Sequence, residues 1–279
     1  MKEIMGYTLI PGNPLHKLFI FYGVPRSGKS VIGHIISKIL GDDNVSSFPF
    51  ESLNKEGHLA ELSSKLLNLS GELQNGAKIE TSTIKSLVGE DRVFGRKLYS
   101  DPFYFINPAK LLTIGNSLPY FNDDSSAIIE RLVILNFETQ VPENERNINL
   151  KSELEEELDG IFRWAIDGLI SLQERGRFLK LQKETATKKT IQTISDSIQY
   201  WITELNISDL KNNEDDKKIY WSLKKAYLDY IEFCKESGIS NEKKTIFKNY
   251  LSQLNGVKVY RDTSKNQDFV EIEYSKLYK

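Results

Sequence analysis

The sequence predicts an α/β fold, followed toward the C-terminus by a smaller winged-helix module. Strand patterns and helix patterns alternate along residues 17–137, which is typical of an α/β sheet. Within that region, an apolar run at 18–22 leads directly into a glycine-rich loop and then into a helical pattern. Residues 191–279 instead show three helical patterns and then two strand patterns, which is the element order of a winged helix.

Local patterns place each element of the larger domain. Residues 1–16 hold several glycines and prolines and predict an extended lead-in. Residues 92–105 predict a hairpin with Ser100, Asp101 and Pro102 at its turn. Core strands are expected at 18–22, 66–69, 110–115 and 132–135, and helices at 31–40, 81–88 and 149–178.

The same patterns divide the chain into a domain at 1–180, a stretch at 181–190 and a C-terminal domain at 191–279. The middle stretch is polar and weakly patterned, which leaves a linker and an exposed helix both open. In the C-terminal domain, helices are expected at 194–205, 219–234 and 243–254, and strands at 257–260 and 269–274. Its aromatic set predicts a core rather than a base-stacking platform: Tyr220, Trp221, Tyr227, Tyr230 and Phe233.

Composition limits the classes of partner. The 279 residues carry 37 basic and 39 acidic side chains, so no global basic field attracts nucleic acid and any such contact must be local. The single cysteine, Cys234, excludes a disulfide framework and predicts an intracellular, reducing compartment such as the cytoplasm. The three scattered histidines argue against a structural zinc site. No apolar run is long enough to span a bilayer, so no membrane partner is expected.

The glycine-rich loop matches a phosphate-binding pattern in full. Its spacing is Gly23-x-x-x-x-Gly28-Lys29-Ser30, between a predicted strand and a predicted helix. The glycines allow the backbone N–H groups to turn inward around phosphates, and the helix N-terminus adds a favourable field. Lys29 is expected to reach the β- and γ-phosphates of ATP, and Ser30 to ligate Mg²⁺. The predicted nucleotide-binding residues are Gly23, Val24, Pro25, Arg26, Ser27, Gly28, Lys29 and Ser30.

Two polar residues follow core strands of the same predicted sheet. Glu72 comes directly after the strand at 66–69, where a carboxylate can orient the attacking water and help to hold Mg²⁺. Asn116 ends the strand at 110–115, where its amide can sense the γ-phosphate. The alternatives are a surface glutamate and a turn-forming asparagine.

Arg131 opens the last predicted strand of the sheet. An arginine at this place can project from one subunit toward the γ-phosphate bound by its neighbour, as an arginine finger. The alternative is a surface arginine paired with Glu130. The order of the motifs favours the finger.

Taken together, these motifs resemble those of the superfamily 3 helicases, in particular the C-terminal helicase part of phage, plasmid and poxvirus primase-helicases. The segments that carry the resemblance are 6–9, 23–30, 69–73, 84–91, 111–119 and 130–132. Arg26 stands where the family often has Asn. Glu130 stands where a second Arg often precedes the finger, which leaves Arg131 as the finger residue.

The resemblance implies an AAA+-like ATPase core that forms a homo-oligomeric ring, a hexamer, with ATP between subunits. It implies translocation on single-stranded DNA and unwinding, in the replication of a phage, virus, plasmid or integrated mobile element. It also implies a primase, either as part of a longer chain or as a separate partner. In such a ring, Lys85 on a helix and Arg96 and Lys97 in the hairpin are the DNA contacts.

Two other functions remain open from the sequence. The chain could be a DNA-dependent ATPase that acts as a switch or loader without unwinding. It could also be a non-enzymatic origin-binding protein in which the winged helix does the work. The predicted helix at 243–254 carries Lys243, Lys244 and Lys248, and leaves contact with duplex DNA and contact with protein both open.

Overall fold

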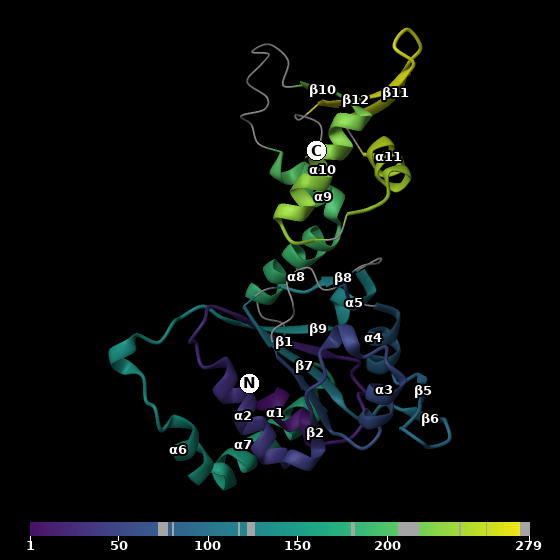
Figure 1. The fold of residues 1–279 in the computed structure, drawn as a ribbon. Coiled ribbons are helices and arrows are strands. Elements are labelled where there is room, and N and C mark those ends of the chain that lie inside the picture. The colour runs from purple at the N-terminus through teal and green to yellow at the C-terminus, as the bar shows by residue number, and fades with distance from the viewer. Residues whose placement is uncertain are drawn as a thin grey trace. The chain divides into compact units, whose positions relative to one another are not determined.

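The chain folds into two compact units, Met1–Gln192 (unit 1) and Thr193–Lys279 (unit 2). The computed structural model describes residues 1–71, 78–79, 81–116, 118–121, 126–179, 182–205, 218–239, 241–254 and 256–273. Figure 1 shows the elements of both units.

Unit 1 is built on a five-stranded sheet in the order β2-β3-β7-β1-β9. Every pair of neighbouring strands in it is parallel. The strands are β1 (Leu18–Gly23), β2 (Val45–Ser46), β3 (Leu67–Ser70), β7 (Lys110–Gly115) and β9 (Leu132–Phe137). Because β7 lies between β1 and β3, the carboxyl ends of these three strands meet at one edge, where open parallel sheets bind ligands.

Helices cover both faces of this sheet (Figure 1). One face packs on α1 (Lys2–Thr8), α2 (Lys29–Leu40) and α7 (Leu158–Arg175). The other packs on α3 (Glu56–Leu62), α4 (Thr81–Val88) and α5 (Ser126–Arg131). The side chains of β1 alternate accordingly: Leu18 and Ile20 face the second group, and Phe19 and Phe21 face the first.

Smaller elements complete unit 1. β5 (Arg92–Gly95) and β6 (Phe103–Ile106) form the predicted hairpin, and β4 (Lys78–Ile79) pairs with β8 (Tyr120–Phe121). Short 3-10 turns lie at Asp42–Asn44, Phe50–Ser52 and Glu143–Glu145. The single helix predicted at 149–178 is two, because α6 (Leu150–Glu156) ends before α7 begins at Leu158.

The N-terminal segment is a helix, α1, and the expected extended lead-in is wrong. Tertiary packing explains the difference. A Cβ added to Gly6 would lie 2.2 Å from the Ala165 carbonyl oxygen, and one added to Gly168 would lie 2.4 Å from the Lys2 carbonyl oxygen. The two glycines therefore let α1 and α7 approach backbone to backbone, and Ile4, Met5 and Tyr7 are buried.

The polar stretch at 181–190 lies largely within a further helix, α8 (Gln182–Ser195), and the boundary between the two units falls inside that helix. Its first part packs on unit 1. Ile191 is fully buried there, and the Asn136 side-chain amide donates to Thr187 Oγ1 at 2.9 Å. These contacts are non-local, and the weak periodicity of the stretch gives little sign of them.

Unit 2 combines helices with a three-stranded antiparallel sheet in the order β10-β12-β11. Its elements run α9 (Ser197–Glu204), β10 (Lys218–Ser222), α10 (Leu223–Glu236), α11 (Lys244–Gln253), β11 (Val257–Asp262) and β12 (Gln267–Glu273). Trp201, Tyr230 and Phe247 are buried at its centre.

Two details of unit 2 differ from the expectation. Residues 219–222 form the edge strand β10 rather than the start of a helix, because Ile219 and Trp221 pair with β12. The helix begins only at Leu223, and the Ser222 side chain caps it by accepting from the Lys225 N–H at 3.2 Å. In the aromatic set predicted as core, Tyr220 is exposed.

A buried lysine joins the N-terminal segment to the sheet. Lys110 opens β7 and is fully buried. Its Nζ donates to the Ile10 carbonyl and lies 4.9 Å from the centroid of the Tyr7 ring. The Tyr7 hydroxyl in turn donates to Asn13 Oδ1 at 2.8 Å. Burial lowers the pKa of Lys110 to about 7, while Glu90 opposes that shift.

Lys110 is therefore expected to make the stability of the fold depend on pH. Its folded pKa lies below the ordinary lysine value, so between the two values the unfolded chain binds one more proton. The free energy of unfolding should then rise with pH from about 7 to about 10.5, by at most about 1.4 kcal/mol per pH unit from this group. Urea unfolding of the wild type and of Lys110→Met across this range measures it. The substitution should flatten the slope, and equal slopes would contradict the assignment.

Candidate functional site

The glycine-rich loop connects β1 to α2 and takes a backbone shape that needs its glycines. Gly23 has φ 147° and Gly28 has φ 87°, both in the left-handed region. A Cβ on Gly23 would lie 2.0 Å from the Phe137 carbonyl oxygen, which accepts from the Val24 N–H at 2.9 Å. Arg26 also has positive φ, and its carbonyl accepts from the Val141 N–H at 3.0 Å. The loop is thus hydrogen-bonded to the last residue of β9 and to the segment that follows it.

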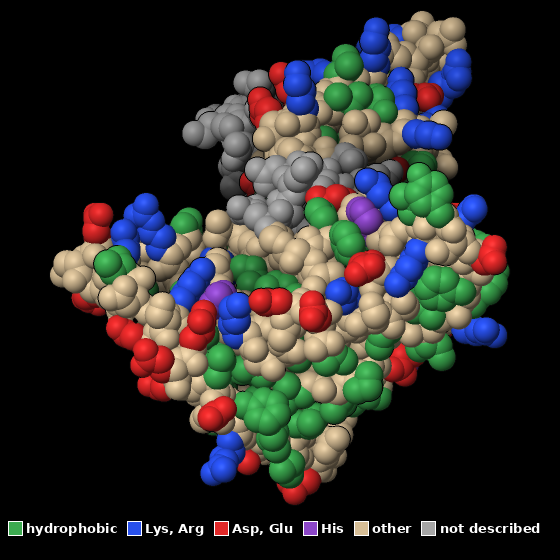
Figure 2. Space-filling model, turned by 60° about the horizontal axis from the view of Figure 1, so that its bottom comes forward, with side chains coloured by type: hydrophobic (Ala, Val, Ile, Leu, Met, Phe, Trp, Pro, Cys, Tyr) green, Lys and Arg blue, Asp and Glu red, His purple; other side chains and the backbone are tan. Residues whose placement is uncertain are grey.

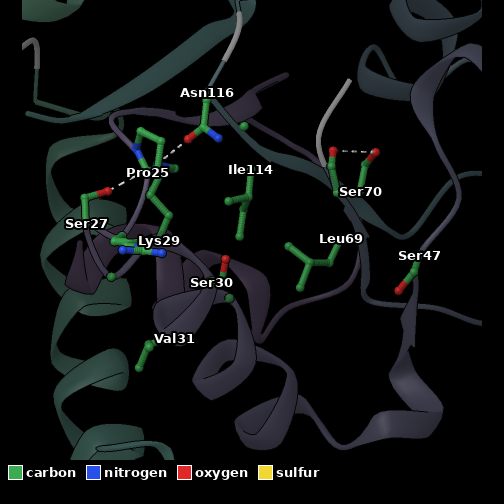
Figure 3. A pocket seen from close by; sticks show the side chains of 15 residues that line it. Pro25, Ser27, Lys29, Ser30, Val31, Ser47, Leu69, Ser70, Ile114 and Asn116 are labelled. Atoms are coloured by element: carbon green, nitrogen blue, oxygen red, sulfur yellow. Dashed lines mark hydrogen bonds between the residues drawn. The ribbon is translucent and has the colours of Figure 1, made fainter. Parts of the chain in front are cut away.

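Lys29 lies inside this loop and is 5% exposed. Its Nζ is 2.8 Å from the Gly23 carbonyl oxygen and 2.6 Å from that of Val24. It is also 3.0 Å from Asn116 Oδ1 and 3.2 Å from Ser27 Oγ (Figure 3). An ammonium has three N–H donors, so these four oxygens share them. The structure thereby brings together two predicted site residues, Lys29 from the loop and Asn116 from the end of β7.

A cavity of about 590 Å³ opens beside this pair. Its lining comes from the loop and the first turn of α2, and from the carboxyl ends of β3 and β7 (Figure 3). The lining residues are Pro25, Arg26, Ser27, Gly28, Lys29, Ser30, Val31, Gly33, Ser47, Leu69, Ser70, Gly71, Ile114, Gly115 and Asn116. No Asp or Glu is among these described residues, whereas two are cationic. With the N-terminus of α2 at its wall, the cavity favours an anion.

Three polar residues at this edge were not predicted from the sequence. Ser47 and Ser70 line the cavity, and Thr113 Oγ1 donates to the Gly71 carbonyl at 3.1 Å. Each lies at or near a strand end, and only the order of the strands shows that these ends meet. One signal was available, an asparagine inside the apolar run at 66–69.

That asparagine, Asn68, is fully buried on β3 and fixes the segment that carries Ser47. Its Oδ1 accepts from Ser46 Oγ and from the Phe48 N–H, both at 2.9 Å. Its Nδ2 donates to the Phe48 carbonyl at 2.9 Å. The residues on both sides of Ser47 are therefore bound to one side chain, which orients Ser47 at the cavity.

The predicted metal ligands are Ser30 and Glu72. Ser30 lies in the first turn of α2 and lines the cavity. Glu72 lies outside the described residues, directly after Gly71, which lines the cavity. Within the described parts of the chain, no group of three or more His, Cys, Asp or Glu side chains could hold a metal ion. A serine hydroxyl directly after the lysine of a phosphate-binding loop is a known type of Mg²⁺ ligand, and Ser30 has this place.

Arg131 lies at the opposite edge of the sheet. Leu132, which follows it, pairs with Leu18 at the start of β1, whereas Gly23 at the loop pairs with Phe137. Six residues of strand separate the two edges, or about 16 Å, too far for an arginine to reach across. Its Nη1 donates to the Ala127 carbonyl at 2.6 Å, and its Nε is buried with no hydrogen-bond partner among the described residues. Arg131 is thus not part of this cavity.

The predicted DNA contacts lie on two elements. Arg96 and Lys97 sit together on the exposed tip of the β5–β6 hairpin, beside Tyr99, which is 97% exposed. The base of the hairpin is fixed on α3, since a Cβ on Gly95 would lie 2.8 Å from the Ala60 Cα and the Arg96 N–H donates to the Glu56 carbonyl at 3.2 Å. Lys85 lies on α4 and is half-buried.

Charge of both signs is interspersed on the face that Figure 2 presents. This agrees with the balanced composition and leaves local patches as the places where nucleic acid could bind. Among the described helices, none combines the length and the apolar character that crossing a membrane requires.

Comparisons with known proteins show a distant similarity to helicases, at low sequence identity. Residues 21–131 match a family of unknown function, DUF5906. The chain is 27% identical over 143 residues to the putative helicase 022R of Frog virus 3 (isolate Goorha), which covers 47% of this chain and 15% of the viral protein. The chain thus spans only a small part of that relative.

Among solved structures, the fold is similar to the C-terminal region of NrS-1 in its apo form. One such structure has a TM-score of 0.56 at 13% identity and covers 97% of this chain and 70% of the other. A second, of NrS-1 residues 305-718, has a TM-score of 0.54 at 13% identity and covers 94% and 67%. The α/β architecture with a parallel sheet is thereby shared, and the sequence similarity points to a helicase-like protein.

Proposed function

We propose that this chain is an ATP-hydrolysing DNA helicase of the superfamily 3 type that acts in the replication of a virus, phage, plasmid or mobile element. The observation that carries the proposal is the Lys29 ammonium, held between the loop carbonyls and Asn116 at the wall of a cavity suited to an anion. The distant similarity to a putative viral helicase supports the same function.

In this proposal the loop is a phosphate-binding loop and each residue has one task. The loop N–H groups and Lys29 bind the phosphates of ATP, and Lys29 exchanges its bonds to loop carbonyls for phosphate oxygens. Ser30 holds Mg²⁺, which would neutralise charge on the phosphates. Asn116 binds and orients the γ-phosphate. Because Asn116 directly follows β7, loss of the γ-phosphate would shift the end of that strand. Glu72 positions the attacking water.

Arg131 then acts in a neighbouring subunit. Arg131 lies at the edge of the sheet opposite the cavity of its own subunit, so it cannot reach that cavity. A residue that completes the site of a neighbouring subunit needs such a position. This supports a homo-oligomeric ring, with six subunits as the resemblance suggests, in which ATP lies between subunits. The exposed hairpin tip, with Arg96, Lys97 and Tyr99, would contact single-stranded DNA through phosphates and a base.

Unit 2 would be a winged helix. Its element order, helix–strand–helix–helix–strand–strand, supports that assignment, with α11 as the third helix and the β11–β12 hairpin as the wing. A primase, in the same protein or as a partner, fits this scheme.

The test is ATP turnover with and without single-stranded DNA, for the wild type beside Lys97→Ala. DNA should stimulate the wild type, and Lys97→Ala should lose most of the stimulation while keeping its basal rate. Loss of one phosphate contact should also lower the log–log salt slope of DNA binding by about 0.7. The matched control is Lys151→Ala on α6, an exposed lysine away from the hairpin.

Two outcomes would count against the proposal. Full stimulation of Lys97→Ala would remove the hairpin as the DNA contact. Hydrolysis by the wild type without any stimulation would favour an ATPase switch that does not move on DNA.

A further inference from the structure

A second hollow lies in unit 2, where three elements meet. It measures about 340 Å³ and is lined by the start of α10, by α11 and by the β11–β12 hairpin. Its lining residues are Leu223, Lys224, Lys244, Thr245, Lys248, Arg261, Asn266, Gln267 and Asp268. We call it the basic hollow, because four of these side chains are cationic and one is acidic.

The cations converge on that one carboxylate. Lys248 Nζ lies 2.7 Å from Asp268 Oδ2, and this bond is the main cause of a lowered pKa for Asp268. Arg261 and Lys244 lower the same pKa through their charges. The carboxylate of Asp268 therefore feels three cations from α11 and β11, and acts as an internal anion that only partly neutralises them.

The remaining lining fits an anion as well. Arg261 Nη2 donates to Asn266 Oδ1 at 2.6 Å, which fixes the guanidinium at the hairpin turn. Lys244 and Thr245 open the first turn of α11, where backbone N–H groups and a hydroxyl can donate to an oxyanion. The described lining holds no aromatic side chain, so it offers charge and donors but no surface for base stacking.

We infer that the basic hollow binds a backbone phosphate of duplex DNA. Guanidinium, ammonium and helix N-terminal donors around a small hollow suit a single phosphate, and the lack of stacking side chains favours a duplex over a single strand. The choice of DNA over another phosphate source rests on the proposed function.

Substitution of Asp268 should change the affinity for duplex DNA in the opposite direction to substitution of the cations. Removing a cation from the hollow should weaken binding of the duplex, whereas removing the internal carboxylate should strengthen it. A general loss of structure would weaken binding in both cases, so the opposite signs separate a phosphate site from a structural effect.

The experiment measures anisotropy of a labelled duplex with the full chain, across a salt series and without ATP. Lys224→Ala, Lys244→Ala and Arg261→Ala should each weaken binding and lower the log–log salt slope by at most about 0.9, the contribution of one phosphate. The matched control is Lys235→Ala, which lies in the last turn of the same helix as Lys224 and away from the hollow. Asp268→Asn should bind about two- to fivefold more tightly.

Three results would overturn the inference: equal affinities for all these variants, weaker binding by Asp268→Asn, or loss of duplex binding in Lys235→Ala as large as in Lys224→Ala. Competition by inorganic phosphate or ATP at concentrations that leave ionic strength unchanged would assign the hollow to a free anion instead. ATP turnover of the same preparations is measured in parallel. Absent turnover in the wild type would refute the proposed motor while the duplex affinities still decide the hollow.

Discussion

Lys29→Ala is expected to lower ATP turnover by at least about 10²- to 10³-fold, the usual cost of removing one preorganised donor to a reacting oxyanion. The side chain is buried in the loop and has the Gly23, Val24 and Asn116 oxygens as partners. The substitution removes the charge that faces the phosphates and leaves these oxygens without their cation. Radiolabelled or coupled-assay turnover measures the effect.

The matched control for this prediction is Lys38→Ala on the same helix. Lys38 pairs with Asp42 at 3.0 Å on the surface, and exposed pairs of this kind contribute little. Its turnover should equal that of the wild type. Near-normal turnover in Lys29→Ala, with both variants folded by circular dichroism, would refute the proposed nucleotide site.

Arg131→Ala should abolish hydrolysis while leaving ATP binding intact. The expected loss is about 10³- to 10⁵-fold, as for other arginine fingers. Binding should persist because Arg131 lies at the sheet edge away from the loop of its own subunit. Turnover and binding of a fluorescent ATP analogue separate the two effects. Arg163→Ala, an exposed arginine on α7, serves as the control and should change neither.

Mixing the Lys29→Ala and Arg131→Ala variants tests directly whether Arg131 acts in a neighbouring subunit. Lys29→Ala subunits have an intact Arg131, and Arg131→Ala subunits have an intact loop. In a mixed ring, some interfaces combine the two intact halves and should regain part of the activity. A subunit that had merely lost its structure could not rescue another. Absence of rescue, in rings shown to exchange subunits, would argue against a finger acting in trans.

The sequence predicted those elements whose signals are local. The strands at β1, β3, β7 and β9 are apolar runs, α2 and α4 have helical periodicity, and the hairpin has turn residues. What the sequence missed depends on distant partners. The helix α1 needs α7 against Gly6, and β10 needs β12 beside Ile219. A pattern within one segment carries no sign of such partners.

The residues of the candidate site also fall into those with a local sequence signal and those that depend on distant parts of the chain. The loop spacing indicated Lys29 and Ser30, and the end of a strand indicated Asn116. In the structure Lys29 Nζ lies 3.0 Å from Asn116 Oδ1, and the roles of both residues in binding ATP stay predictions. Ser47 could not be predicted, because it reaches the cavity only through the strand order β2-β3-β7-β1 and is held there by the buried Asn68 on β3. The roles of Glu72, Arg131 and the hairpin stay predictions.

The strand β9 links Arg131 to the glycine-rich loop. It starts directly after Arg131, and at its other end the Phe137 carbonyl accepts from the Val24 N–H in the glycine-rich loop. In the proposed ring, this strand would connect the nucleotide bound by its own loop with the nucleotide bound by the neighbouring subunit. A finger drawn toward a neighbouring γ-phosphate would pull on the loop of its own subunit. Linkage makes such coupling reciprocal, so in the proposed ring the ATP affinities of neighbouring sites would depend on one another.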